Sequence, residues 1–233
     1  KLWLALANGI SKVDILSPIT FYSNYKGLEG SVEAIARFNN ELYVATLNGV
    51  FVLRNNNSER AFEKVKGIET ECWDLTLFGK VSSQKLLVAT NHGLYSIDTK
   101  GVLRLEMNGL VSSVKASSFD STIIYLGIET GFMIVKNFNE KITKIENLQS
   151  EIVNIQEEDD KHIWLGTNSE GVIELVKEDG IFNPYIHNES NGFVEGSVWA
   201  AKFHGQIVLA TDKGLYAVKR NNRLSLIHIS EPT

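Results

Sequence analysis

The sequence has little cysteine, little proline and no long apolar run. Its 233 residues include one cysteine, Cys72, and three prolines. A single cysteine excludes an internal disulfide framework. No run of about 18 apolar residues occurs, so we expect any membrane span to lie outside this sequence.

Positive charge is also scarce. The chain has 23 Lys and Arg residues against 28 Asp and Glu residues, a net charge of −5, and its basic residues form no cluster. Nucleic-acid binding needs a dense cationic surface that neutralises phosphates, so it is not expected. No motif of a hydrolase nucleophile, a phosphate loop or a calcium loop occurs. The histidines have no metal-ligand spacing, so we expect no catalytic residue, metal or cofactor.

What the sequence does contain is one motif in six copies. The first two copies begin with Leu2-Trp3-Leu4-Ala5 and Leu42-Tyr43-Val44-Ala45. Each copy ends on a glycine, and consecutive glycines are 38 to 44 residues apart: Gly9, Gly49, Gly93, Gly131, Gly171 and Gly214. A period near forty of strand–turn–strand units is typical of β-propeller blades, so the sequence predicts an all-β propeller.

Two columns of the motif predict how neighbouring blades pack. The second position is usually large and apolar, and we expect Trp3 and Trp164 to fill the core there. Two residues later the side chain is always small, which lets adjacent sheets approach closely. The small column consists of Ala5, Ala45, Ala89, Gly127, Gly166 and Ala210.

A second repeated segment lies about eighteen residues before most of the motif glycines, as in Glu29-Gly30-Ser31-Val32 and Glu195-Gly196-Ser197-Val198. We expect it to form the innermost strand of each blade, beside the central channel. One column of this segment is mostly polar and is our candidate ligand-binding site: Glu33, Asp74, Lys115, Asn154 and Trp199. The alternatives are that channel water solvates these side chains and that Trp199 packs on the channel wall.

An acidic run, Glu157-Glu158-Asp159-Asp160-Lys161, joins two strands of the fifth repeat. We expect a solvated turn there, because like charges repel one another and the glycines of a calcium loop are missing.

Both ends of the chain depart from the repeat. The chain starts within a strand pair, so we expect its first blade to lack the innermost strand. Residues Leu224–Thr233 resemble the translation of a transposase-type sequencing adapter in all ten positions. We therefore expect one truncated propeller domain at 1–223 and an artefactual tail at 224–233. The expected domain is a fragment with six repeats from a seven-bladed parent. Four repeats are complete four-stranded blades, and the two partial ones are the first, without its innermost strand, and the last, without its outer strand.

The motif also carries a family resemblance. Ile163-Trp164-Leu165-Gly166-Thr167 and the segment from Leu209 to Tyr216 fit the pattern Leu-Trp-Leu-x-Thr-x-x-Gly-Leu. On this pattern the chain, from Leu2 to about Arg220, resembles the two-component regulator propeller family. The resemblance implies an extracytoplasmic sensor domain of a bacterial membrane receptor, such as a hybrid histidine kinase, located in the periplasm.

The resemblance leads us to expect a non-catalytic domain that binds a small molecule or saccharide ligand, or a partner. The parent receptor would be a homodimer, attached to the membrane only through segments outside this sequence. One alternative is a polysaccharide lyase or hydrolase, with Glu33 and Asp74 as its acid and base. Another alternative is an intracellular protein-interaction scaffold.

Overall fold

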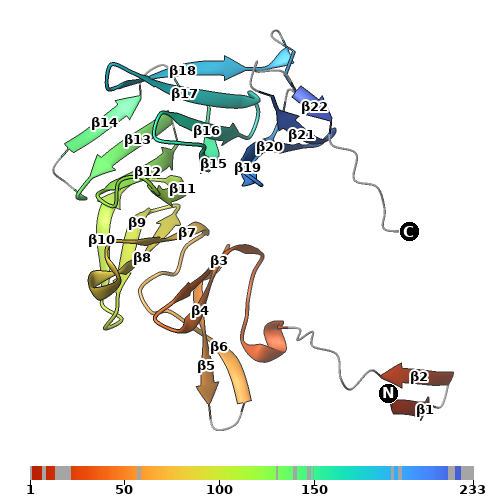
Figure 1. Cartoon of the computed structure of the whole chain (residues 1–233). Helices are drawn as coiled ribbons and strands as arrows, with labels where there is room; N and C mark the ends of the chain where they lie inside the picture. Colours follow the sequence, from red (N-terminus) through yellow and green to blue (C-terminus); the bar gives the residue numbers. More distant parts are fainter. Residues whose placement is uncertain are drawn as a thin grey trace.

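The computed structural model describes residues 2–6, 9–13, 22–56, 59–129, 131–138, 141–145, 148, 150–189, 192–193, 196–219 and 224–226. Within this part, regular structure consists of β-strands and two short 3-10 turns, η1 (Asn24–Lys26) and η2 (Val81–Ser83). Five four-stranded sheets follow one another in an arc (Figure 1). The prediction of an all-β propeller architecture is therefore confirmed.

Each sheet is an antiparallel meander whose strands pair in chain order. The first two sheets contain β3 (Val32–Phe38), β4 (Glu41–Thr46), β5 (Gly49–Asn56), β6 (Glu59–Lys64), β7 (Cys72–Phe78), β8 (Lys85–Thr90), β9 (Gly93–Asp98) and β10 (Leu103–Asn108). The next two contain β11 (Val111–Ala116), β12 (Ile123–Ile128), β13 (Gly131–Lys136), β14 (Lys141–Ile145), β15 (Ile152–Glu157), β16 (His162–Thr167), β17 (Val172–Glu178) and β18 (Ile181–His187). The fifth contains β19 (Val198–Phe203), β20 (Gln206–Thr211), β21 (Gly214–Val218) and β22 (Leu224–Leu226).

The first strand of every sheet lies on the inner side of the arc, next to the first strand of the neighbouring sheet (Figure 1). These inner strands are β3, β7, β11, β15 and β19. They are the segments that the second repeated piece of the sequence predicted as innermost, and that prediction is confirmed. We call each four-stranded sheet a blade and each boundary between two blades a seam.

The core lies in the seams. In the middle four repeats the large residues of the motif are buried there, and Trp164 is 1% exposed. The side chain of Trp3, which was also predicted to fill the core, lies outside the described part of the chain. Trp164 packs on Val198 and Ala200 of the following blade, and Tyr43 belongs to a cluster with Leu75 of its following blade. Ala45 and Ala89 of the small column are fully buried. Packing by a large column beside a small one is therefore confirmed for these blades.

In most blades a threonine side chain makes a hydrogen bond across the turn between the second and third strands. The Thr46 hydroxyl donates to the carbonyl oxygen of Gly49 at 3.0 Å and accepts the N–H of Asn48 at 3.1 Å. Gly49 has a φ of 127°, which residues with a Cβ seldom adopt. The same bond to the glycine carbonyl recurs at Thr90, Thr167 and Thr211. These bonds explain why a threonine lies three or four residues before the glycine in these copies of the motif.

In the described part of the chain the first repeat has only two strands, whereas the last repeat has a full set of four. In the first repeat, β1 (Leu2–Leu6) and β2 (Gly9–Val13) pair with each other as a two-stranded sheet. The last repeat was expected to lack its outer strand, and this was wrong, because Leu224–Leu226 pairs with β21 as β22. An open sheet edge offers unpaired N–H and C=O groups to any alternating segment. The pairing is thus compatible with an origin of residues 224–233 outside the repeat.

Candidate functional site

The five predicted ligand residues do not all occupy equivalent positions on the inner strands. The residues that pair with the small column are Ala34, Asp74, Ser113, Asn154 and Trp199. Glu33 lies one residue before this position in β3, and Lys115 lies two residues after it in β11. A β-bulge precedes the position in the first four inner strands, which accounts for the error at Glu33.

Asp74 and Asn154 connect their blades to the next blade. The Val114 N–H donates to Asp74 Oδ2 at 3.0 Å, and the Ala200 N–H donates to Asn154 Oδ1 at 2.8 Å. The second carboxylate oxygen of Asp74 accepts the N–H of Leu75 at 2.8 Å. Both oxygens of Asp74 are therefore engaged by backbone groups at a seam. These contacts give Asp74 and Asn154 a role in joining blades.

The other three predicted residues are more open. Glu33 is exposed at the bulge of β3. Trp199 is 52% exposed on the last blade. Lys115 is half-buried, and its charge lies close enough to Asp74 to influence that carboxyl. Among the described residues, no hydrogen bond or ion pair joins two of the five candidates.

Burial raises the pKa of Asp74 to about 6. The hydrogen bonds from Val114 and Leu75 and the nearby Lys115 charge act in the opposite direction without cancelling it. A carboxyl whose pKa is higher in the folded than in the unfolded state favours folding at low pH, and this contribution is lost as the pH rises through 6. The ionised seam carboxylate therefore lowers stability at neutral pH.

The Asp74→Asn variant should show the pH dependence that this shift implies. Because asparagine does not titrate, the free energy of unfolding of the variant should rise relative to the parent chain between pH 4 and pH 8, by up to about 3 kcal/mol. Urea unfolding at several pH values measures the difference. The absolute stability of the variant also includes the loss of one acceptor oxygen, which does not depend on pH.

Asp98→Asn is the control for this prediction. Hydrogen bonds from the N–H groups of Val102 and Lys100 lower the pKa of the Asp98 carboxyl. Its substitution should therefore change the pH dependence in the opposite direction. Identical pH profiles of the Asp74→Asn variant and the parent would show that burial does not perturb Asp74.

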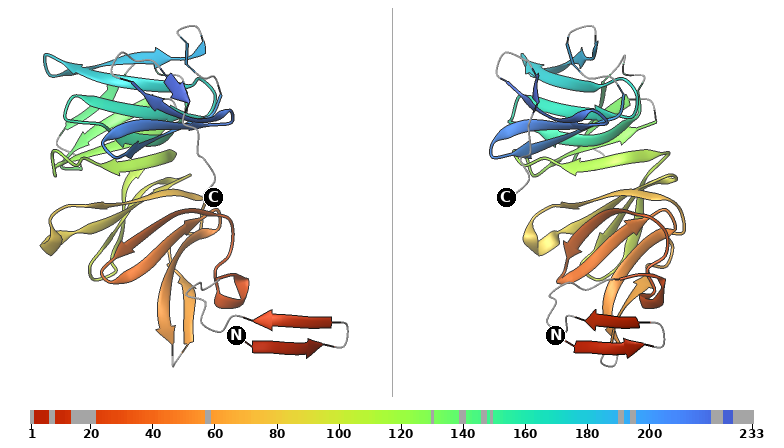
Figure 2. Two further views of the ribbon diagram at one scale, coloured as in Figure 1. Left: turned by 45° about the vertical axis from the view of Figure 1, so that its right-hand side comes forward. Right: turned by 90° about the vertical axis from the view of Figure 1, so that its right-hand side faces the viewer.

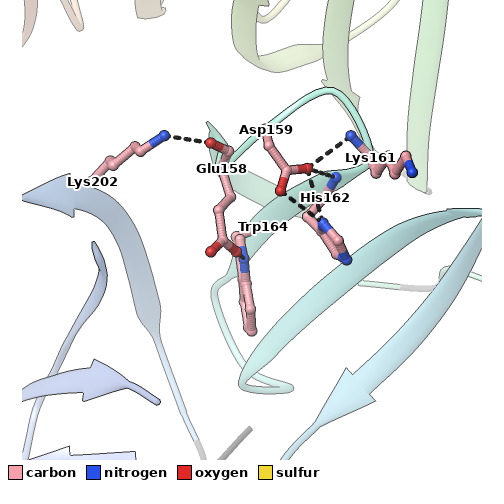
Figure 3. A network of polar contacts seen from close by, with 6 residues as sticks. All are labelled: Glu158, Asp159, Lys161, His162, Trp164 and Lys202. Carbon is pink, nitrogen blue, oxygen red and sulfur yellow. Dashed lines mark hydrogen bonds and ion pairs between the residues drawn. The ribbon is translucent and has the colours of Figure 1, made fainter. Parts of the chain in front are cut away.

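The acidic turn of the fourth complete blade is bonded throughout most of its length, not solvated as predicted. Glu157 is 4% exposed, and its two oxygens accept the Ser117 hydroxyl and the Ser118 N–H, each at 2.6 Å. Glu158 Oε2 accepts the indole N–H of Trp164 at 2.7 Å, and its carbonyl oxygen accepts a bond from Lys202 (Figure 3). Hydrogen bonds therefore join this turn to the preceding blade and to the following blade.

Asp159 organises the rest of the turn. Its Oδ1 accepts the N–H groups of Lys161 and His162, each at 2.8 Å, and lies 2.9 Å from His162 Nδ1 (Figure 3). Burial would raise the pKa of the Asp159 carboxyl, but these hydrogen bonds outweigh it and the pKa is lowered. Asp159 is therefore a stable anion that fixes the orientation of the His162 ring.

A polar cavity of about 480 Å³ opens at the seam beside this turn. Its walls come from both of the last two blades, and we call it the seam cavity. Carboxylates, imidazoles, an amide and one ammonium group converge on it. The lining residues are Glu158, Asp159, His162, Trp164, Glu174, His204, Gly205, Gln206, Ile207, Val218 and Lys219.

The inner wall of the seam cavity is held by buried groups. Glu174 and His187 are both less than 10% exposed, and His187 Nε2 lies 2.9 Å from Glu174 Oε2. The His187 ring stacks between Trp164 and Phe193, at centroid distances of 5.5 and 4.3 Å. This packing fixes Trp164 and Glu174, so the inner wall is rigid, whereas His204, Gln206 and Lys219 on the outer wall are exposed.

Sequence reasoning did not find the seam cavity. Its residues come from turns and strands of two different repeats, and no single motif contains them. The interblade hydrogen bonds of Asp74 and Asn154 could more easily be predicted from the sequence than the seam cavity, because Asp74 and Val114 are separated by one repeat period. A polar residue that recurs in a column facing the next repeat could have been interpreted as an interblade bond.

The described residues contain no group of three or more His, Cys, Asp or Glu side chains that could hold a metal ion. Cys72 is a free thiol in a seam, and burial raises its pKa to about 12. Such a thiol is unreactive at neutral pH. A search of the described residues finds no helix with the length and hydropathy to span a membrane.

The sequence matches no protein-family model, and a comparison with curated proteins found no match. Solved structures share the fold. The extracellular domain of the hybrid two-component system BT4673 from B. thetaiotaomicron is 20% identical, with a TM-score of 0.66 over 85% of this chain and 28% of that one. The extracellular domain of the hybrid two-component system BT3049 from the same organism is 14% identical, with a TM-score of 0.67 over 88% of this chain and 31% of that one.

The fold is not confined to such receptors. Virginiamycin B lyase from Staphylococcus aureus is 12% identical, with a TM-score of 0.62 over 86% of this chain and 71% of that one. At these identities the comparisons establish a shared blade architecture. The chain spans less than a third of the length of the two extracellular domains.

Proposed function

We propose that this chain is part of the extracytoplasmic, ligand-sensing propeller of a bacterial signalling receptor of the two-component regulator propeller family. The observation that carries the proposal is the combination of six motif copies with a fold shared over 85% to 88% of the chain with extracellular domains of hybrid two-component systems. Propellers have many different functions, so the fold alone does not indicate a sensor. The resemblance of the repeated motif to the receptor family supports that function.

We place ligand binding in the seam cavity, and the ligand class is a small polyhydroxyl compound such as a saccharide. A volume of about 480 Å³ falls within the range of small-molecule sites. The carboxylates of Glu158 and Asp159 can accept hydrogen bonds from hydroxyl groups, and Gln206 offers both donors and an acceptor. Glu33 on β3 and Trp199 on β19 are two separate inner-strand positions that are also open to a ligand.

A ligand bound between two blades has a direct means of signalling. It contacts both walls of one seam, so its affinity depends on how the two blades are arranged. A receptor responds only if the ligand binds one arrangement better than the other, which shifts the population of the two. In the proposed homodimeric receptor this shift would be transmitted by segments outside the present sequence.

Calorimetric titration with a panel of neutral mono- and disaccharides tests the ligand class. We expect at least one sugar to bind, and Gln206→Ala to weaken that sugar about tenfold by removing one or two hydrogen bonds. Gln84→Ala, on a distant blade, is the matched control and should leave binding unchanged. Equal losses in both variants would exclude the seam cavity, and absence of binding by the whole panel would overturn the saccharide assignment.

The alternative is a polysaccharide lyase or hydrolase, and the fold shared with virginiamycin B lyase does not by itself favour it. It requires Glu33 and Asp74 to act as acid and base on a substrate. Both oxygens of Asp74 accept backbone N–H groups, whereas Glu33 is exposed on the neighbouring inner strand. Turnover of polysaccharide that is abolished by Glu33→Gln and Asp74→Asn would favour the enzyme over the sensor.

A further inference from the structure

One face of the first complete blade is left partly uncovered. Every inner strand carries two apolar positions that face the preceding blade, which we call the first-face pair. In the last four blades these residues are at most 8% exposed: Cys72 and Leu75, Val111 and Val114, Ile152 and Ile155, and Val198 and Ala200. The same two ladder positions in β3 hold Val32 and Ile35, which are 47% and 67% exposed.

The outer part of the same face is already covered. Tyr22 and Leu28 pack against Val44, Phe51 and Phe62, and the rings of Tyr22 and Phe62 meet edge to face at 5.3 Å. These contacts come from the segment that leads into β3. The uncovered area is therefore limited to the inner end of the face, where Val32 and Ile35 lie, and it continues an interface that is already formed.

The described part of the connection into β3 resembles the corresponding part of the next connection. Leu28 precedes Val32 by four residues, as the fully buried Ile68 precedes Cys72. Eighteen residues separate β2 from β3, and between 12 and 19 residues separate the equivalent strands of the other blades. The chain length thus permits β1 and β2 to take the place of the second and third strands of a preceding blade.

The β1–β2 hairpin also contains the residue types that cover the first-face pair in the other seams. In the other seams, the first-face pair is covered by the large and small columns of the preceding blade, as Tyr43 and Ala45 cover Cys72 and Leu75. Trp3 and Ala5 occupy these two columns in the first repeat. In the structure β1 and β2 pair with each other, and the hairpin lies to one side of the arc (Figure 1 and the left view of Figure 2).

We propose that the exposed inner end of the β3–β6 face is the docking surface for the β1–β2 hairpin, with Ala5 against Val32 and Trp3 against Ile35. The docked hairpin supplies the middle strands of a preceding blade and adds a fifth seam of the same kind as the four already formed. This arrangement is independent of any ligand in the seam cavity.

An engineered disulfide tests the docked arrangement at one pair of positions. At the equivalent place in another seam, a Cβ added to Gly127 would lie 3.0 Å from the Cβ of Ile152, close to the separation that a disulfide requires. Ala5→Cys and Val32→Cys are therefore combined in the full chain. Cys72→Val removes the native thiol, and valine already occupies its equivalent positions at Val111 and Val198.

We expect mild oxidation to link the two introduced thiols within one chain, as seen by non-reducing electrophoresis and peptide mapping. The matched control pairs Val32→Cys with Leu4→Cys, one residue before Ala5; successive positions of a strand lie on opposite faces, so this pair should stay reduced. Equal linkage of both pairs, or none in either, would overturn the proposal. Links between chains would show that a second copy covers the surface instead.

Hydroxyl-radical footprinting of the unmodified chain gives an answer that does not depend on the folding of a cysteine variant. If the hairpin docks, Ile35 should be labelled as weakly as Leu75, which is 8% exposed, and Trp3→Ala should raise the labelling of Ile35 alone. Strong labelling of Ile35 in the unmodified chain, unchanged by Trp3→Ala, would contradict docking.

Discussion

Replacing Gly166 by valine is expected to lower the free energy of unfolding by about 3 kcal/mol. A Cβ at this position would lie 2.2 Å from the carbonyl oxygen of Val198 in the next blade. That oxygen belongs to the backbone of β19, so relief requires the last two blades to move apart. Urea unfolding, followed by far-ultraviolet circular dichroism, measures the loss.

Ala210→Val is the matched control for the seam substitution. Ala210 lies in the same small column, but on the last described blade, where it is only partly buried. We expect this variant to lose less than about 1 kcal/mol, within the range of ordinary surface changes. Equal losses at Gly166 and Ala210 would mean that the small column does not control the approach of neighbouring blades.

The second large effect is expected at the acidic turn, where Glu157→Ala should cost about 2 to 4 kcal/mol. The substitution removes two short hydrogen bonds to Ser117 and Ser118 of the preceding blade. Bonds to a charged acceptor contribute more than neutral ones, and the Ser118 N–H would lose its carboxylate partner at a partly buried contact. Thermal and urea unfolding of the variant would detect a loss of this size.

Asp160→Ala serves as the control within the same acidic run. Asp160 is exposed, and we expect its substitution to change stability by less than about 0.5 kcal/mol. If both substitutions are equally neutral, Glu157 does not join the blades, and the solvated turn that the sequence predicted would be the better description.

Much of the fold follows from local properties of the sequence. The period near forty, the glycine turns and the apolar columns predict the strands and their order, because each blade is a meander of consecutive segments. The strand registers on the inner side were less predictable. β3 and β7 have the same β-bulge, at Glu33 and at Trp73, so Glu33 is equivalent to Trp73 and Ala34 is equivalent to Asp74; no residue type marks that bulge in the sequence.

The polar seams were hard to predict for another reason. The partners of Glu157 lie in the preceding blade, about forty residues away, and the walls of the seam cavity come from two repeats. A sequence pattern shows a charged run but not the neighbour that buries it. The polar column was therefore interpreted as one surface, although Asp74 and Asn154 join blades while Glu33 and Trp199 remain open.

Sequencing the source DNA on both sides of this coding segment tests the proposed sensor function most directly. The account predicts a membrane-spanning segment followed by a signalling output module, such as a histidine kinase, in the same reading frame. A stop codon soon after the remaining blades, with no membrane-spanning segment on either side, would contradict it and favour a free-standing enzyme or scaffold.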